Sequence, residues 1–456
     1  MLRLDVRLVG LIVVGWMNSL LAPDALGQYG VSSASVGMTR AGLMLRGSQF
    51  RVEEFVNYHR HELPQPSDGK AIALDVCWDR SGNGNLIFQI GLATASQRGS
   101  ELKIRPLNLV LVIDCSGSMS GNRIDNVKQG IRSFVERLRP EDLVTIVTYE
   151  STPRVALEAA CKTDVAKIDR VIRELRAGGS TNLHAGLMLG YQQAEKHFDS
   201  ERTNRVILLT DGIANTGVIA PAEIAADSKK FNEKNIDLST IGLGHDLDQD
   251  LLRGLSDAGR GLLHFIGDDE DIAKVFVREI DSLLSSAARE VQVDVRIDTK
   301  SEKVRFFGYQ PKTTKKKHLF ALDDLNHDAT QVIVGEILDS EASKPRNISV
   351  KLTYIDEVTG ESVTQKQELE LGRSPSSVVQ SADLQKNFRI ARLATGLKEF
   401  AELIEREKPQ DAHRHLKKLV DQATRAEHQA DADVARLIEI CRGYLKECES
   451  LASTDR

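Results

Sequence analysis

Between about residues 106 and 286, short apolar runs alternate with segments whose apolar residues recur every three to four positions. A nearly continuous apolar run indicates a strand buried on both faces, and the longer period indicates a helix with one apolar side. This alternation predicts a doubly wound, mostly parallel α/β sheet with helices on both faces. The predicted strands are 107–113, 143–148, 205–210, 236–243 and 262–266, and the predicted helices are 124–138, 165–175, 184–198, 221–231, 247–258 and 268–284.

The regions on either side of this domain show the two-residue period of half-exposed strands. Apolar and polar residues alternate in 72–76 and again in 291–297, and further strands are expected at 86–92, 332–338, 348–355 and 363–371. Because neither group of strands is large enough to be stable alone, we expect both to form one antiparallel β-sandwich into which the α/β domain is inserted. Beyond Pro375 a helical period returns, which predicts a small C-terminal unit of three helices.

The N-terminus has the pattern of an export signal. Arg3 and Arg7 precede an apolar run at 8–21, and small residues at 25–27 form a cleavage site before Gln28. The apolar run is too short and too interrupted to span a bilayer comfortably. We therefore expect the protein to be exported to the periplasm, the cell surface or the medium, with membrane association only through an uncleaved N-terminus. The alternative is a buried N-terminal helix.

The predicted organisation has five parts. They are a signal peptide at 1–27, an N-terminal segment with a helix and strands at 28–105, the α/β domain at 106–288, β-sandwich strands at 289–373 and a helical domain at 374–456.

Composition narrows the possible functions. The 456 residues are 41% hydrophobic and 28% charged, as in ordinary globular proteins. A formal net charge of −6 leaves no basic surface for nucleic acid, and aromatic residues at 5% offer few stacking platforms. The five cysteines form no zinc-type motif and are interpreted as small buried apolar residues. His59 and His61 have no third ligand nearby in the sequence, so no metal site is expected there.

Three oxygen-rich segments carry the candidate chemistry. Asp114, Ser116 and Ser118 follow the strand at 107–113, and their spacing of two lets one extended turn aim all three at one point. Thr181 precedes a predicted helix, and Asp211 follows the strand at 205–210. Because open α/β sheets bind ligands beyond the carboxyl ends of their strands, these segments are expected to converge.

Hydroxyl and carboxylate oxygens suit Mg²⁺, or Mn²⁺ or Ca²⁺, better than zinc. With only two carboxylates at the site, the metal would stay electrophilic, and water or an incoming carboxylate would complete its coordination. Without metal, we expect Asp114 and Asp211 to face each other with no cation to offset their repulsion.

The three segments resemble the metal-ion-dependent adhesion site of von Willebrand factor type A (VWA) domains, which have a Rossmann-like fold. They read Asp-Cys-Ser-Gly-Ser, Gly-Gly-Ser-Thr and Thr-Asp-Gly, and match the site at all five positions. The resemblance implies that Ser116, Ser118 and Thr181 bind the metal directly, while Asp114 and Asp211 act largely through water.

A second resemblance covers most of the chain after residue 45. Residues 51–58 and the helical tail look like bacterial exported VWA proteins of the YfbK-like group. Many of those relatives are lipoproteins, but this chain has no cysteine near its predicted cleavage site for lipid attachment.

These features predict a metal-dependent protein-binding module outside the cytoplasm, whose partner presents an acidic side chain. No general acid–base pair or activated nucleophile is evident, so neither an enzyme nor a small-molecule substrate is expected. Cys115, the spacer between two candidate ligands, is interpreted as an inert buried thiol. The alternatives are an accessory subunit of an ATP-driven chelatase or AAA+ machine, and an unrecognised hydrolytic enzyme.

Overall fold

The computed structural model describes residues 45–67, 69–95, 105–244, 247–266, 275, 286–300, 303–338, 345–372, 378–425 and 431–454. The predicted signal peptide and almost all of the predicted helix at 268–284 lie outside these residues. The chain forms two compact units. We call the unit containing Lys103–Ser285 the α/β unit, and the unit formed by the described segments before and after it the sandwich unit.

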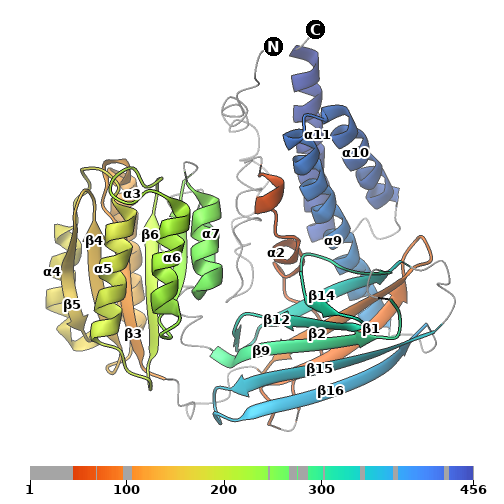
Figure 1. The fold of residues 1–456 in the computed structure, drawn as a ribbon, viewed down its shortest axis with the longest axis horizontal. Helices are drawn as coiled ribbons and strands as arrows, with labels where there is room; N and C mark the ends of the chain where they lie inside the picture. Colours follow the sequence, from red (N-terminus) through yellow and green to blue (C-terminus); the bar gives the residue numbers. More distant parts are fainter. Residues whose placement is uncertain are drawn as a thin grey trace. The chain divides into compact units, whose positions relative to one another are not determined.

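The α/β unit is built on a six-stranded sheet with the order β5-β4-β3-β6-β7-β8 (Figure 1). Its strands are β3 (Leu107–Asp114), β4 (Leu143–Tyr149), β5 (Pro153–Ala160), β6 (Thr203–Thr210), β7 (Asp237–Leu243) and β8 (Arg260–Ile266). All pairs are parallel except that of β4 with β5. The predicted doubly wound sheet is confirmed, with β5 as an unpredicted antiparallel edge strand.

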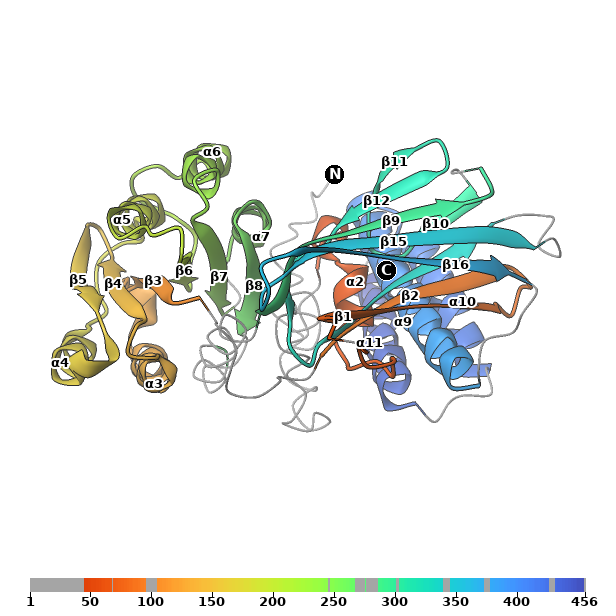
Figure 2. The same cartoon turned by 90° about the horizontal axis from the view of Figure 1, so that it is seen from below.

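Helices cover both faces of this sheet, as the periodicity predicted. Figure 2 shows α3 (Asn122–Arg137) and α4 (Val165–Glu174) on one face, and α5 (Leu183–Lys196), α6 (Pro221–Asn232) and α7 (Gln249–Ala258) on the other. The helix starts follow local rules of helix formation. Pro221 occupies the first turn of α6, and the side chains of Asn182 and Asp248 cap α5 and α7.

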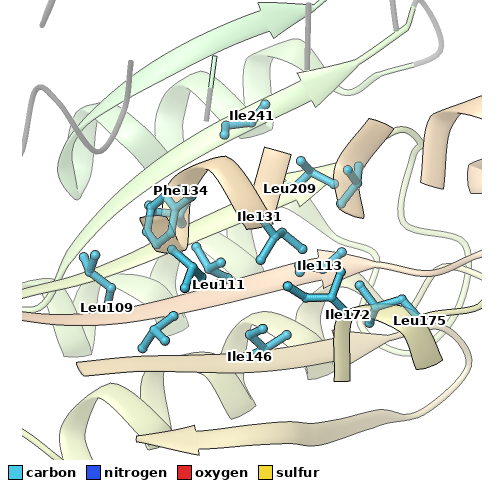
Figure 3. Packing of buried hydrophobic residues seen from close by; sticks show 14 of the residues in the cluster. Leu109, Leu111, Ile113, Ile131, Phe134, Ile146, Ile172, Leu175, Leu209 and Ile241 are labelled. Atoms are coloured by element: carbon cyan, nitrogen blue, oxygen red, sulfur yellow. The ribbon is translucent and has the colours of Figure 1, made fainter. Parts of the chain in front are cut away.

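The alternation of β3 supplies the core of the α/β unit. Leu109, Leu111 and Ile113 are buried in one cluster with residues of α3 and α4, including Ile131 and Ile172 (Figure 3). On the other face, a Cβ on Gly190 of α5 would lie 2.3 Å from Cγ2 of Val112. Glycine thus allows α5 to approach the central strand closely.

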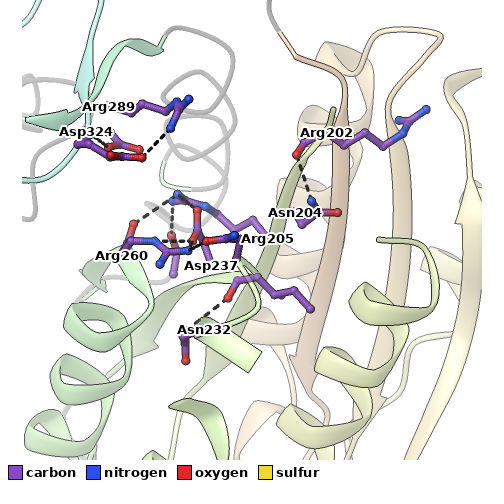
Figure 4. Close-up of polar contacts among 12 residues, drawn as sticks. Arg202, Asn204, Arg205, Asn232, Asp237, Arg260, Arg289 and Asp324 are labelled. Carbon is purple, nitrogen blue, oxygen red and sulfur yellow. Dashed lines mark hydrogen bonds and ion pairs between the residues drawn. The ribbon is translucent and has the colours of Figure 1, made fainter. Parts of the chain in front are cut away.

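Charged residues at the amino ends of the strands neutralise one another. Asp237 accepts from Arg205 at 3.3 Å and from Arg260 at 2.7 Å, and Asn204 donates to the Arg202 carbonyl at 3.0 Å (Figure 4). These contacts lie at the amino ends of the strands, whereas Asp114 and Asp211 lie at the carboxyl ends.

The sandwich unit contains two antiparallel sheets. One has the order β1-β2-β14-β10, and the other has the order β11-β12-β9-β15-β16, with β13 paired to β9. The strands are β1 (Ile72–Arg80), β2 (Leu86–Thr94), β9 (Ser286–Ile297), β10 (Val304–Phe306), β11 (Lys312–Thr314), β12 (Lys317–Ala321), β13 (Leu325–Asn326), β14 (Thr330–Ile337), β15 (Arg346–Asp356) and β16 (Ser362–Leu371). Because β2 pairs with β14, strands from both sides of the α/β unit share one sheet, as predicted.

Helices complete the sandwich unit. They are the short helices η3 (Gly47–Gln49) and α2 (Val52–Val56), and the long helices α9 (Val378–Glu405), α10 (Pro409–Arg425) and α11 (Ala432–Thr454). The last three confirm the predicted helical region. Helix α9 is anchored to β1 by hydrogen bonds from Gln380 to Asp75 and from Gln385 to Asp79. Among the described helices, none combines the length and apolarity needed to cross a membrane.

A polar network is buried where α9 meets β2 and the segment after α2. Asn387 donates to Gln89 at 2.9 Å and to Asp383 at 3.0 Å, and its amide lies 3.1 Å from Nδ1 of His61. The other ring nitrogen of His61 lies 3.2 Å from Oδ1 of Asn57. We call these five residues the inner network.

Candidate metal centre

The five predicted site residues lie around the carboxyl ends of β3 and β6. Asp114 is the last residue of β3, and Asp211 follows the last residue of β6. The chain leaves β3 towards α3 on one face of the sheet and leaves β6 towards α6 on the other (Figure 2). Such a switch point separates two loops at neighbouring strand ends and is where open α/β sheets bind ligands.

Asp114 is buried and fixed by three donors. Its Oδ1 accepts the backbone N–H of Ser116 at 2.8 Å, and its Oδ2 accepts the hydroxyls of Thr210 at 2.9 Å and Tyr149 at 3.2 Å. Burial raises the pKa of Asp114, against the opposing effect of the hydrogen bonds from Ser116 and Thr210. The three hydrogen bonds therefore hold the carboxyl group in one orientation. Because the group is buried, a cation bound nearby would stabilise its charged form.

The serine hydroxyls link the two aspartates. Oγ of Ser116 lies 3.1 Å from Oγ of Ser118, which donates to Oδ1 of Asp211 at 2.7 Å. Ser116 and Asp211 are buried, whereas Ser118 is exposed to solvent. The structure thus brings Asp114, Ser116, Ser118 and Asp211 into one connected group, of which Ser118 is the exposed member.

Thr181 belongs to a loop that is tied to both other segments. The N–H of Gly117 donates to the carbonyl of Gly179 at 3.1 Å, and the N–H of Thr181 donates to Oδ1 of Asn215 at 2.8 Å. A Cβ placed on Gly212 would lie 3.9 Å from Oγ1 of Thr181, so this hydroxyl faces the segment that carries Asp211. We call the five side chains of Asp114, Ser116, Ser118, Thr181 and Asp211 the oxygen cluster.

A glycine shapes the loop before Thr181. Gly179 has a φ of +78°, and a Cβ there would lie 1.9 Å from Oε2 of Glu150. Only glycine takes this backbone conformation readily. The Gly-Gly part of the motif thus positions Thr181 rather than contributing a ligand.

Arg123, a residue of α3 that the sequence did not mark, neutralises part of the site. Its Nη1 lies 2.7 Å from Oδ2 of Asp211, and the two side chains are 27% and 0% exposed. The expectation that no cation offsets the two aspartates was therefore wrong. Sequence reasoning missed Arg123 because its partner lies 88 residues away in the chain. Tyr149 was missed for the same reason, and the contact of Thr210 with Asp114 was not foreseen, since only the folded sheet places these side chains beside Asp114.

The chemistry of the donor set fits a hard divalent cation. The oxygen cluster offers three hydroxyls and two carboxylates, with no imidazole or thiolate, which suits Mg²⁺, Mn²⁺ or Ca²⁺. No group of three or more histidine, cysteine, aspartate and glutamate residues suited to a metal occurs in the described part of the chain. A bound cation would supply an electrophilic position that accepts an oxygen from outside.

Two side chains near the site show no sign of reactivity. Burial raises the pKa of Cys115 to about 12, so its thiol stays protonated and unreactive at neutral pH. His184, near the start of α5, lies 2.9 Å from Asp227 of α6 rather than against the oxygen cluster.

Comparison with known proteins agrees with the motif. The family model of the von Willebrand factor type A domain matches residues 108–278. YfbK of Escherichia coli is 29% identical over 310 residues, which is 65% of this chain and 52% of YfbK. Inter-alpha-trypsin inhibitor heavy chain H2 of Mus musculus is 27% identical over 41% of this chain, but only 21% of that protein is covered. The chain thus spans about half the length of YfbK and less of the heavy chain.

Structural comparison supports the same fold across both units. A solved von Willebrand factor type A structure from Catenulispora acidiphila has a TM-score of 0.53 and 18% identity, and covers 79% of this chain and 88% of its own. VWA domains often bind a divalent metal at this motif, commonly mediate metal-dependent protein interactions and are generally not catalytic. This chain therefore carries a VWA domain at residues 108–278 and is similar to YfbK over 65% of its length.

Proposed function

We propose that the protein is a non-enzymatic, metal-dependent protein-binding module that works outside the cytoplasm. In this proposal the oxygen cluster holds a Mg²⁺-type ion, and an acidic side chain of the partner protein completes its coordination. The observation that carries the proposal is the oxygen cluster itself, in which a buried aspartate is linked through Ser116 and the exposed Ser118 to a second aspartate.

The donor set explains why an acidic partner is favoured. Hydroxyl ligands do not cancel the charge of the metal, so two carboxylates leave it electrophilic. An incoming carboxylate adds both an oxygen donor and a negative charge. Catalysis has no comparable support, because the Cys115 thiol is protonated at neutral pH and His184 is paired with Asp227.

Export is supported by the charged and apolar pattern of residues 1–27. The mature protein would then begin at or near Gln28, which N-terminal sequencing can establish. An intact Met1 on protein purified from the cytoplasm would contradict this location.

The metal site can be tested by thermal unfolding of the full chain. Binding to the native state alone stabilises it by about 2.7 kcal/mol at a hundredfold excess over Kd. For a unit of this size, such a gain raises Tm by roughly 5–10 °C. We expect Mg²⁺ at roughly 5–10 mM, compared with chelator, to produce this shift in the wild type and not in Asp211→Asn.

Asp227→Asn is a matched control, since Asp227 is another aspartate of the same unit held in an ion pair, but on α6. It should retain the full shift. Because the uncharged amide of the Asp211→Asn protein cannot form the ion pair with Arg123, this protein should also melt lower than the wild type in chelator. Equal shifts with Mg²⁺ in the wild type and Asp211→Asn would exclude the oxygen cluster as the metal site.

A further inference from the structure

An open groove of about 810 Å³ lies on the α/β unit, between α3 and the end of α4. It is lined by the buried Ile124 and Leu175 and by the cationic side chains of Lys128, Arg132, Arg173 and Arg176. Figure 2 shows the two helices on the same face of the sheet. None of these cations belongs to the oxygen cluster, and the proposed metal site does not account for them.

The groove begins at the loops that carry the oxygen cluster. Ser120 and Gly121 line it, and they follow closely after Ser118 in the chain. Ala177 lines it from the other side and leads into Gly178 and Gly179. The hydrogen bond from Gly117 to Gly179 joins these two loops. A partner segment bound at the metal would therefore lie beside loops that also border the groove.

The charges of the groove are positive on balance. Lys128 pairs with Asp125 at 3.0 Å, while Arg132 and Arg173 share Asp169 at 3.3 Å and 2.8 Å. The groove thus has four cationic side chains but only these two carboxylates paired with them, so it carries excess positive charge. The chain as a whole has a formal net charge of −6.

The three arginines remain available to a ligand, whereas the side chain of Lys128 is only 15% exposed. The side chains of Arg132 and Arg173 are 45% and 64% exposed, and exposed ion pairs of this kind contribute little. Arg176 donates to the backbone carbonyls of Arg173 and Leu175 at the end of α4. A guanidinium has five N–H donors, so these contacts leave others for a carboxylate.

We propose that this groove binds additional acidic residues of the partner, so that the recognised element is an acidic segment rather than a single carboxylate. The inference rests on the proposed function, because one acidic residue reaches the metal while its neighbours lie against Arg132, Arg173 and Arg176. Such complementarity raises the rate of association and selects among partners that each offer one carboxylate.

Nucleic acid is the other polyanion that a cationic groove could hold. The groove has no aromatic residue on which a base could stack, and the negative net charge of the chain opposes a long anion. An acidic peptide, whose charges match the short length of the groove, fits better.

Fluorescence anisotropy with labelled hexaglutamate peptide tests the inference on the full chain with Mg²⁺. We expect the wild type to bind hexaglutamate and not hexaglutamine, with affinity that falls as salt is added. In the double variant Arg173→Gln/Arg176→Gln the Kd should rise about tenfold, as expected for losing two charge contacts. Its Mg²⁺-induced rise in Tm should equal that of the wild type, because the oxygen cluster is intact.

The matched control is Lys229→Gln/Lys230→Gln, which removes two cations that are 69% and 70% exposed on α6, across the sheet from the groove. Its Kd should stay within about twofold of the wild type, since only long-range charge is altered. Equal losses in the two double variants would overturn the groove as a site and indicate a general charge effect.

Further outcomes separate this inference from the proposed function. A normal Mg²⁺ shift without binding of hexaglutamate overturns the acidic segment and leaves the metal site standing. Absence of any Mg²⁺ shift overturns the metal site itself. Tighter binding of a single-stranded oligothymidylate than of hexaglutamate, lost in Arg173→Gln/Arg176→Gln, overturns the acidic peptide in favour of nucleic acid.

Discussion

Each of the two units contains a cluster of polar side chains that includes aspartate, but the two clusters differ in their access to solvent. In the oxygen cluster of the α/β unit, the hydrogen bonds run through the exposed Ser118 to Asp211, whose carboxylate also binds the partly exposed Arg123. In the inner network of the sandwich unit, Asn387 and the side chain of His61 are 0% exposed. The amide nitrogen of Asn387 contacts Gln89, Asp383 and His61, while its Oδ1 is buried without a hydrogen-bond partner among the described residues.

The difference shows how to separate a binding site from a structural network of similar composition. Buried polar groups that bind mainly one another hold elements together, and their burial closes them to a ligand from solvent. Polar groups at strand ends that reach solvent can replace a hydrogen bond within the protein by a contact with a ligand. The inner network joins α9, β2 and the segment after α2, whereas the oxygen cluster joins three loops beside an open groove.

The largest effect is expected from Asn387→Ala. This change leaves Gln89, His61 and Asp383 with buried polar atoms that have lost a partner, at a cost of about 3 kcal/mol in the free energy of unfolding. Trp78 is buried in the sandwich unit and is one of only two tryptophans. Urea unfolding followed by its fluorescence, in a Trp16→Phe background, measures the loss.

Asn347→Ala is the control, because Asn347 is exposed on β15 of the same unit. It should change the free energy of unfolding by less than about 0.5 kcal/mol. Similar small losses in both variants would mean that the inner network does not hold the unit together.

A pH effect of intermediate size is expected from His59, whose ring packs edge-to-face on His61 at 4.7 Å. Burial, with the nearby charges of His61 and Lys386, lowers the pKa of His59 from 6.5 to about 4. Below pH 6.5, His59 is therefore protonated in the unfolded chain but stays neutral in the folded unit. The free energy of unfolding falls as the pH drops towards 4. The contribution is about 2 kcal/mol after allowance for partial exposure.

The same tryptophan assay between pH 7 and pH 4 checks this prediction. His59→Gln should flatten the stability profile in that window. His413→Gln, on the surface of α10 beside Glu449, should leave the slope as it is in the wild type. A slope unaltered by His59→Gln would show that other groups carry the acid sensitivity.

The smallest effect, and the one that sharpens the comparison most, is expected from Arg123→Gln. Loss of the ion pair with Asp211 should lower the stability of the metal-free α/β unit by about 1 kcal/mol, or roughly 2–4 °C in Tm. Removal of a positive charge beside the site should strengthen Mg²⁺ binding and enlarge the metal-induced shift.

Arg132→Gln is the control, since Arg132 lies on the same helix but pairs with Asp169. Its metal-induced shift should match that of the wild type. If Arg123→Gln left the shift unchanged as well, Arg123 would be a purely structural partner of Asp211.

The sequence by itself determined the elements and the class of fold. Every strand predicted between residues 107 and 266 is present, because burial on both faces imposes a continuous apolar run that is visible locally. The candidate ligands were also visible, since Asp114, Ser116 and Ser118 form one short motif at a strand end. The short strands β10 to β13 and the edge strand β5 were missed because so few residues, or so exposed a position, carry little periodic signal.

Only the tertiary structure decided which distant side chains meet. Arg123 reaches Asp211 across 88 residues, and His61 reaches Asn387 across 326. Such pairings depend on the order of strands and on the packing of helices, which periodicity does not encode. The same holds for the groove, because Lys128 and Arg173 face one space only after α3 and α4 pack side by side on the sheet. Local sequence patterns indicate how much of each segment is buried. A site depends in addition on how separate segments are placed and on where their side chains point, which local patterns do not contain.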